Sequence, residues 1–168
     1  MPRRSSVLFI AGGALILAGL IGAFLSGRPP GSDEVYVPAH LGALLLTETR
    51  QGASAAAEIQ RLHDGTLPVA SAAVARYGPA GEATLWVAAA ATESDAARLV
   101  EAMGRAIGSG DSPFTPLDKD VIAGVTVYPL TGMGQEHIYF QAGRLALWLA
   151  ADPGVADEAR LAVVEAYR

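Results

Sequence analysis

The three histidines are the first residues to examine for chemistry. His40, His63 and His137 lie far apart in the chain, and no two have the i, i+2 or i, i+4 spacing that puts two imidazoles on one metal from a single element. Glu136 and His137 form an adjacent acid–base pair, but neighbouring residues of a strand point to opposite faces. We therefore interpret each histidine as a surface or capping residue, with His63 near a helix end.

Residues 110–112, of sequence Gly-Asp-Ser, are the strongest candidate for a nucleophile. They resemble the nucleophile block of serine esterases of the GDSL type, which would make Ser112 the nucleophile. That block should follow a strand, and its Asp-x-x-His partner is missing because no histidine here has an aspartate three positions earlier. The Gly-rich turn 132–134 lacks the lysine and helix of a P-loop, and Asp118 and Asp120 lack EF-hand spacing. We expect no catalytic, cofactor or metal site, and no enzymatic activity.

Composition narrows the classes of partner. The chain has 168 residues, of which 51% are hydrophobic and 17% charged, so it can bury a core and is not disordered. Its 12 Lys and Arg against 17 Asp and Glu give a net charge of −5, which predicts no nucleic-acid partner. The absence of cysteine excludes disulfides, thiolate metal sites and thiol nucleophiles.

An uncharged apolar run from Val7 to Leu25 predicts a membrane span, because about 20 such residues cross a bilayer as a helix. Arg3 and Arg4 precede the run, which predicts a cytoplasmic N-terminus and an extracytoplasmic C-terminal domain, periplasmic or on the cell surface. We expect an uncleaved signal-anchor of a single-pass membrane protein. The alternative is a cleaved signal peptide, although its apolar region would be shorter.

Small residues recur every fourth position in this run, at Ala14, Ala18, Gly22 and Ser26. Such a stripe lets a second helix approach closely, so it predicts a homodimer or a membrane-protein partner in the lipid bilayer. The alternative is that an Ala/Gly-rich segment produces the stripe by chance.

Four segments follow from these observations. They are a cytoplasmic N-terminus at 1–6, the anchor helix at 7–26, a Pro/Gly linker at 27–36, and a single α+β domain at 37–168. Prolines and glycines in the linker cannot continue the helix.

Hydrophobic periodicity and turn signals predict the order β-α-β-β-α-β-β-β-α in the domain. The helices are expected near 52–63, 92–107 and 153–167, the second with Thr92 as its N-cap. Strands paired in hairpins with interspersed helices favour an antiparallel, ferredoxin-like α+β sandwich.

An internal strand-helix repeat is visible when Gly81 is aligned with Gly143. Without a gap, Trp86 then meets Trp148, and the helix residues 97–99 meet the identical residues 159–161. Because the chain has only two tryptophans, this coincidence predicts two equivalent strand-helix units.

The alternation of strand residues separates an apolar face from an aromatic one. Leu145, Leu147 and Leu149 share one side, and both tryptophans fall on the other. We predict a partner-binding surface on the second side, made of Trp86, Trp148, Tyr128, Tyr139 and His137. The alternative is that segment 108–124 covers these residues and makes a second core.

Three functions are consistent with these observations. We favour a non-enzymatic accessory or scaffold subunit of a larger membrane protein complex. The alternative is an extracytoplasmic ligand-binding or sensor domain with a pocket lined by Trp86, Trp148, Tyr139 and His137. An enzyme of unrecognised type is the least favoured.

Overall fold

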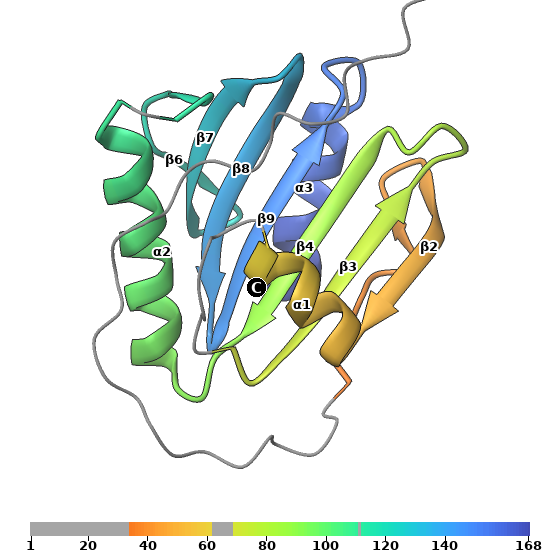
Figure 1. Cartoon of the computed structure of the whole chain (residues 1–168). Coiled ribbons are helices and arrows are strands. Elements are labelled where there is room, and N and C mark those ends of the chain that lie inside the picture. Colours follow the sequence, from red (N-terminus) through yellow and green to blue (C-terminus); the bar gives the residue numbers. More distant parts are fainter. Residues whose placement is uncertain (1–33, 62–68, 111) are drawn as a thin grey trace, which may run out of the picture.

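The computed structural model describes residues 34–61, 69–110 and 112–168. These residues form one antiparallel sheet of nine strands that curls into a half-barrel, with three helices packed on it (Figure 1). The strand order is β1-β2-β3-β4-β9-β8-β7-β5, and β6 also pairs with β7.

Three short strands and six long ones make up the sheet. The bounds are β1 His40–Leu41, β2 Leu44–Gln51, β3 Ser71–Tyr77, β4 Ala83–Ala89, β5 Thr115–Pro116, β6 Asp120–Ile122, β7 Val125–Gly132, β8 Gln135–Ala142 and β9 Leu145–Ala151. The helices are α1 Ala53–Arg61, α2 Glu93–Gly108 and α3 Ala156–Tyr167. The predicted order of elements agrees with this one apart from β1, β5 and β6.

The central pair of strands is β4 and β9, in which Trp86 lies directly opposite Trp148. Each of these strands closes a hairpin, β3-β4 and β8-β9, and each is followed by a helix, α2 and α3. The two segments aligned in the sequence are therefore neighbours at the middle of the sheet.

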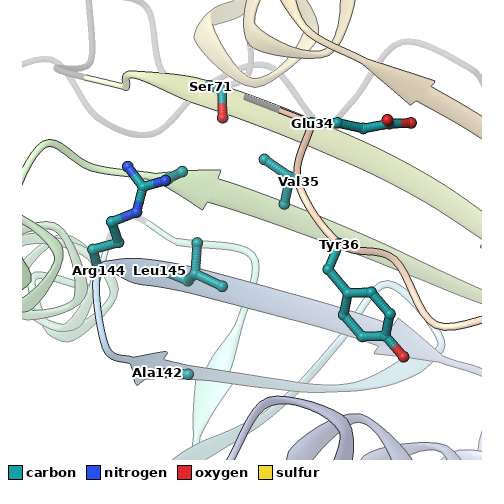
Figure 2. Close-up of a pocket in the computed structure, with 8 residues that line it drawn as sticks. Glu34, Val35, Tyr36, Ser71, Ala142, Arg144 and Leu145 are labelled. Carbon is teal, nitrogen blue, oxygen red and sulfur yellow. The ribbon is translucent and has the colours of Figure 1, made fainter. Parts of the chain in front are cut away.

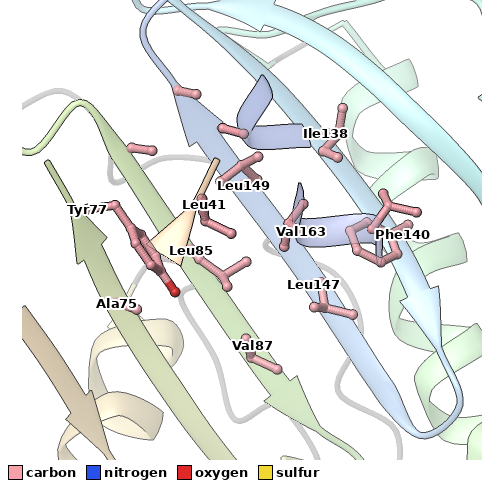
Figure 3. Packing of buried hydrophobic residues seen from close by; sticks show 14 of the residues in the cluster. Leu41, Ala75, Tyr77, Leu85, Val87, Ile138, Phe140, Leu147, Leu149 and Val163 are labelled. Carbon is pink, nitrogen blue, oxygen red and sulfur yellow. The ribbon is translucent and has the colours of Figure 1, made fainter. Parts of the chain in front are cut away.

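The main core lies on the face that carries the leucines of β4 and β9. Leu85, Leu147 and Phe140 are buried there, and α3 covers them with Val163 and Val164 (Figure 3). Burial of large apolar side chains at this density provides most of the free energy that holds α3 to the sheet.

The opposite face carries both tryptophans and is covered by α1 and α2 (Figure 1). The N-cap of α2 is Thr92 as predicted, since its hydroxyl oxygen accepts a hydrogen bond from the Asp95 amide at 3.1 Å.

The predicted ferredoxin-like sandwich is wrong. In that fold the helices lie together on one face of a small sheet, whereas here α1 and α2 pack on the tryptophan face and α3 packs on the leucine face. The physical reason lies in the connections: a tight turn at 152–155 folds α3 back over the leucines, and residues 90–92 send α2 to the other side.

The predicted single-pass membrane protein is also not supported. Within 34–61, 69–110 and 112–168, no helix is long and apolar enough to cross a bilayer. The expected anchor at 7–26 and its stripe of Ala14, Ala18, Gly22 and Ser26 lie outside the described residues. The transmembrane, signal-anchor and extracytoplasmic assignments are therefore not carried further.

The packed body begins before residue 37, where the predicted domain starts. Val35 is only 6% exposed and belongs to the main core. The end of the predicted linker, from Glu34, is thus part of the folded unit.

Candidate functional site

The predicted aromatic residues do assemble in space. Trp86, Trp148, Tyr139 and Tyr128 are direct cross-strand neighbours on β4, β9, β8 and β7, and we call these four the aromatic row. The ring centroids of Trp148 and Tyr139 are 5.6 Å apart and those of Tyr139 and Tyr128 are 4.9 Å apart, both in stacked orientation. Pairs of this kind stabilise an antiparallel sheet.

His137 is held at the side of the row by two hydrogen bonds. Trp148 donates its Nε1 hydrogen to His137 Nδ1 at 3.2 Å, and His137 Nε2 lies 3.1 Å from the Gly132 carbonyl oxygen. Because an indole only donates and a carbonyl only accepts, the imidazole is neutral with its proton on Nε2. Burial lowers the pKa of His137, which is 5% exposed, and the bond to Gly132 opposes that shift.

Other elements cover much of the row. Tyr139 is 5% exposed beneath α2, whose Gly104 leaves room for the tyrosine hydroxyl. The ring of Phe114 contacts both Trp148 and His137, with centroids 5.2 and 4.8 Å away. Phe114 belongs to segment 108–124, so the predicted alternative of a covered second core describes this part of the face.

Trp86 lies at the other end of the row, next to α1. It packs with a small cluster that includes Ile59 and Val74, and it remains half-buried. Its Nε1 is buried and has no hydrogen-bond partner in the part of the chain that the structure describes.

Of the residues considered for catalysis, His40 and Ser112 lie far apart. His40 lies on β1 and Ser112 precedes β5, and these strands stand at opposite ends of the sheet. The Ser112 hydroxyl oxygen accepts a hydrogen bond from the Phe114 amide at 3.1 Å, as in a turn. His63 lies outside the described residues. No group of three or more acidic or histidine side chains within the described ranges could hold a metal ion.

An open-sided cavity of about 330 Å³ lies on the leucine face, at the end where β4 stops and β9 starts (Figure 2). Its lining is mostly apolar, with a few polar groups at the rim. The lining residues are Glu34, Val35, Tyr36, Ser71, Ala89, Ala142, Arg144 and Leu145. None of the residues predicted to line a pocket is among them.

Three large exposed apolar side chains border β7. Leu117 is 53% exposed and its amide donates to the Pro129 carbonyl at 3.0 Å, Val121 is 63% exposed and pairs with Thr126, and Met133 is 62% exposed in the turn after β7. We call Leu117, Val121 and Met133 the apolar edge. At about 3.4 Å per residue of strand, it extends over roughly 25 Å.

Two turns beside β7 contain residues in an unfavourable backbone conformation. Ala123 and Met133 have φ angles of +49° and +54°, and each is followed by a glycine with positive φ. Two-residue hairpins of this type favour Asn or Gly at the first position, because other side chains are strained there. Met133 is thus both strained and exposed.

Sequence reasoning missed the apolar edge and the cavity. The apolar edge depends on two strands of only two and three residues, which leave almost no periodic signal. One signal in the sequence could have indicated the apolar edge. Ala-Gly and Met-Gly stand at hairpin positions where Asn-Gly or Gly-Gly is usual, so turn propensity does not explain the choice of Ala123 and Met133.

No family model matches the chain, and no curated protein or solved structure matches it either.

Proposed function

We propose that this chain is a non-enzymatic accessory or scaffold module that docks on a partner protein through the apolar edge. The observation that carries the proposal is that Leu117, Val121 and Met133 follow one border of the sheet, each more than half exposed. Val121 lies opposite Thr126 and Leu117 beside Pro129, on opposite faces of that border, so the partner would contact both faces of the edge. Single exposed apolar residues are ordinary on a protein surface, but a group along one border is typical of an interface.

The strain at Met133 supports the same interpretation. A methionine with positive φ costs free energy that asparagine or glycine would save, and its side chain gains no compensating burial within the described residues. Strained positions of this kind often belong to functional contacts.

Charge indicates the chemistry of the partner surface. Asp118 and Asp120 are exposed beside Leu117 and Val121, with Lys119 between them, and the whole chain carries a net charge of −5. The complementary surface is therefore apolar at its centre and basic at its rim.

Site-specific photo-crosslinking tests this proposal in cells that make the protein. A crosslinking amino acid at position 121 should capture one partner protein, and the capture should disappear when Leu117→Asp is added. The control places the same amino acid at Leu161, an exposed residue of α3 that is 47% accessible. Equal capture at both positions, or capture that survives Leu117→Asp, would refute docking at the apolar edge.

A second candidate function is ligand binding, which the cavity of about 330 Å³ favours because its size falls in the range of small-molecule sites. A titration with small amphipathic carboxylates tests ligand binding. It follows the chemical shifts of the Ser71, Ala89 and Leu145 amides. Saturable shifts confined to these residues support ligand binding, and unchanged spectra at millimolar ligand contradict it.

A further inference from the structure

Residues 34–38 cross the leucine face without pairing with any strand in the part of the chain that the structure describes. Side chains from three other elements hold this segment. The Val35 amide donates to Gln51 Oε1 at 2.9 Å, the Tyr77 hydroxyl donates to the Pro38 carbonyl at 3.0 Å, and the Tyr167 hydroxyl donates to the Tyr36 carbonyl at 2.7 Å.

The segment also covers apolar residues. Val35 is 6% exposed in the main core, Val37 packs against that core, and the ring of Tyr36 meets the ring of Tyr167 edge-on with centroids 5.7 Å apart. Tyr167 closes α3, so the segment joins the start of the described chain to its last helix.

The cavity lies directly beside this segment. Glu34, Val35 and Tyr36 form one of its walls, and Val35 and Leu145 project into the same space (Figure 2). Side chains beside a void have fewer packing contacts on that side, so the segment is held less tightly than a strand of the sheet.

We infer that residues 34–38 form a releasable latch, which opens locally while the sheet stays folded and thereby widens the open-sided cavity. Three side-chain hydrogen bonds hold the latch, whereas each sheet strand is held by a ladder of backbone bonds.

Amide hydrogen exchange of the full-length protein tests the latch. Tyr167→Phe removes one of the three hydrogen bonds and leaves the ring, so the hydrogen-bonded amide of Val35 should exchange about 3- to 10-fold faster, while those of Leu85 and Leu147 keep their rates. Tyr77→Phe should have the same local effect by removing a different bond, the one to the Pro38 carbonyl, which keeps the test valid if one variant folds poorly.

The matched control is Tyr128→Phe, which removes a tyrosine hydroxyl far from the latch and should change none of these rates. Unchanged exchange at Val35 in both latch variants would overturn the inference. So would acceleration at Val35 that equals the acceleration at Leu85 and Leu147, because the segment would then open only when the whole sheet unfolds.

Discussion

At the scale of single residues, the aromatic row is a structural layer whose polar atoms are used internally. Trp148, His137 and the Gly132 carbonyl form a chain of two hydrogen bonds, and Phe114 shields it from water. A histidine with both nitrogens bonded has no lone pair to offer a substrate or a metal.

The first prediction concerns the pH dependence of stability. Burial lowers the pKa of folded His137 below its usual value of 6.5, so the unfolded chain takes up a proton that the folded chain does not. The contribution of His137 to stability is complete above about pH 6.5 and declines as pH falls toward the lowered pKa. Urea unfolding between pH 5 and 8 should therefore show a steeper loss toward acid in the unmodified protein than in His137→Gln. A matching profile in His137→Gln would contradict this.

The second prediction concerns Phe114. Its ring covers Trp148, so Phe114→Ala should shift Trp148 emission to longer wavelength and increase its quenching by acrylamide. We expect a loss of about 2 to 3 kcal/mol in unfolding free energy, somewhat less than for a fully buried phenylalanine. A Trp86→Phe background isolates the Trp148 signal, and Leu161→Ala provides a control at an exposed site. A Trp148 already exposed in the unmodified protein would contradict the covered row.

At the scale of elements, each of the two hairpins beside β7 has an exposed residue with an unfavourable positive φ angle, which lowers the stability of the fold. Met133 and Ala123 occupy the same position of the same kind of turn, but only Met133 belongs to the apolar edge.

The third prediction compares asparagine at these two positions. Met133→Asn and Ala123→Asn each create an Asn-Gly turn and should each raise the unfolding free energy by about 0.5 to 1 kcal/mol. Only Met133→Asn should weaken partner capture at position 121. Chemical denaturation and crosslinking yield measure the two effects, and equal capture by the two variants would remove Met133 from the interface.

The elements themselves were largely predictable from the sequence. Thr92, with acidic residues after it, predicted the start of α2, and Gly- and Pro-rich turns predicted the hairpins. The strands β1, β5 and β6 were not predictable, because two or three residues carry no periodicity and their pairing is decided by β2 and β7.

At the scale of the whole molecule, the way the elements pack was not predictable. Both α2 and α3 follow a central strand, yet they cover opposite faces, and this choice depends on turns of only three or four residues. The alignment of Trp86 with Trp148 predicted two equivalent strand-helix units. The structure places the two tryptophans side by side in paired strands, but the helices that follow cover opposite faces, so the units are not equivalent. The five predicted partner-binding residues do share a face, but the burial of His137 and Tyr139 depends on Phe114 and α2, which alternation within a strand cannot reveal.

The described part of the molecule therefore presents a partly covered aromatic layer, a main core under α3, and an apolar edge beside β7. The docking proposal rests on the last of these features. The partner should sit on that edge and leave the exposed face of α3 uncovered.

The most direct test is the native mass of the full-length protein purified gently from its own cells. The unmodified protein and Leu161→Asp should both travel with one stoichiometric partner protein, and Val121→Asp should have the mass of the chain alone. An unmodified protein that purifies as a monomer or as a homodimer would contradict the proposed accessory module, as would a Val121→Asp variant that keeps its partner.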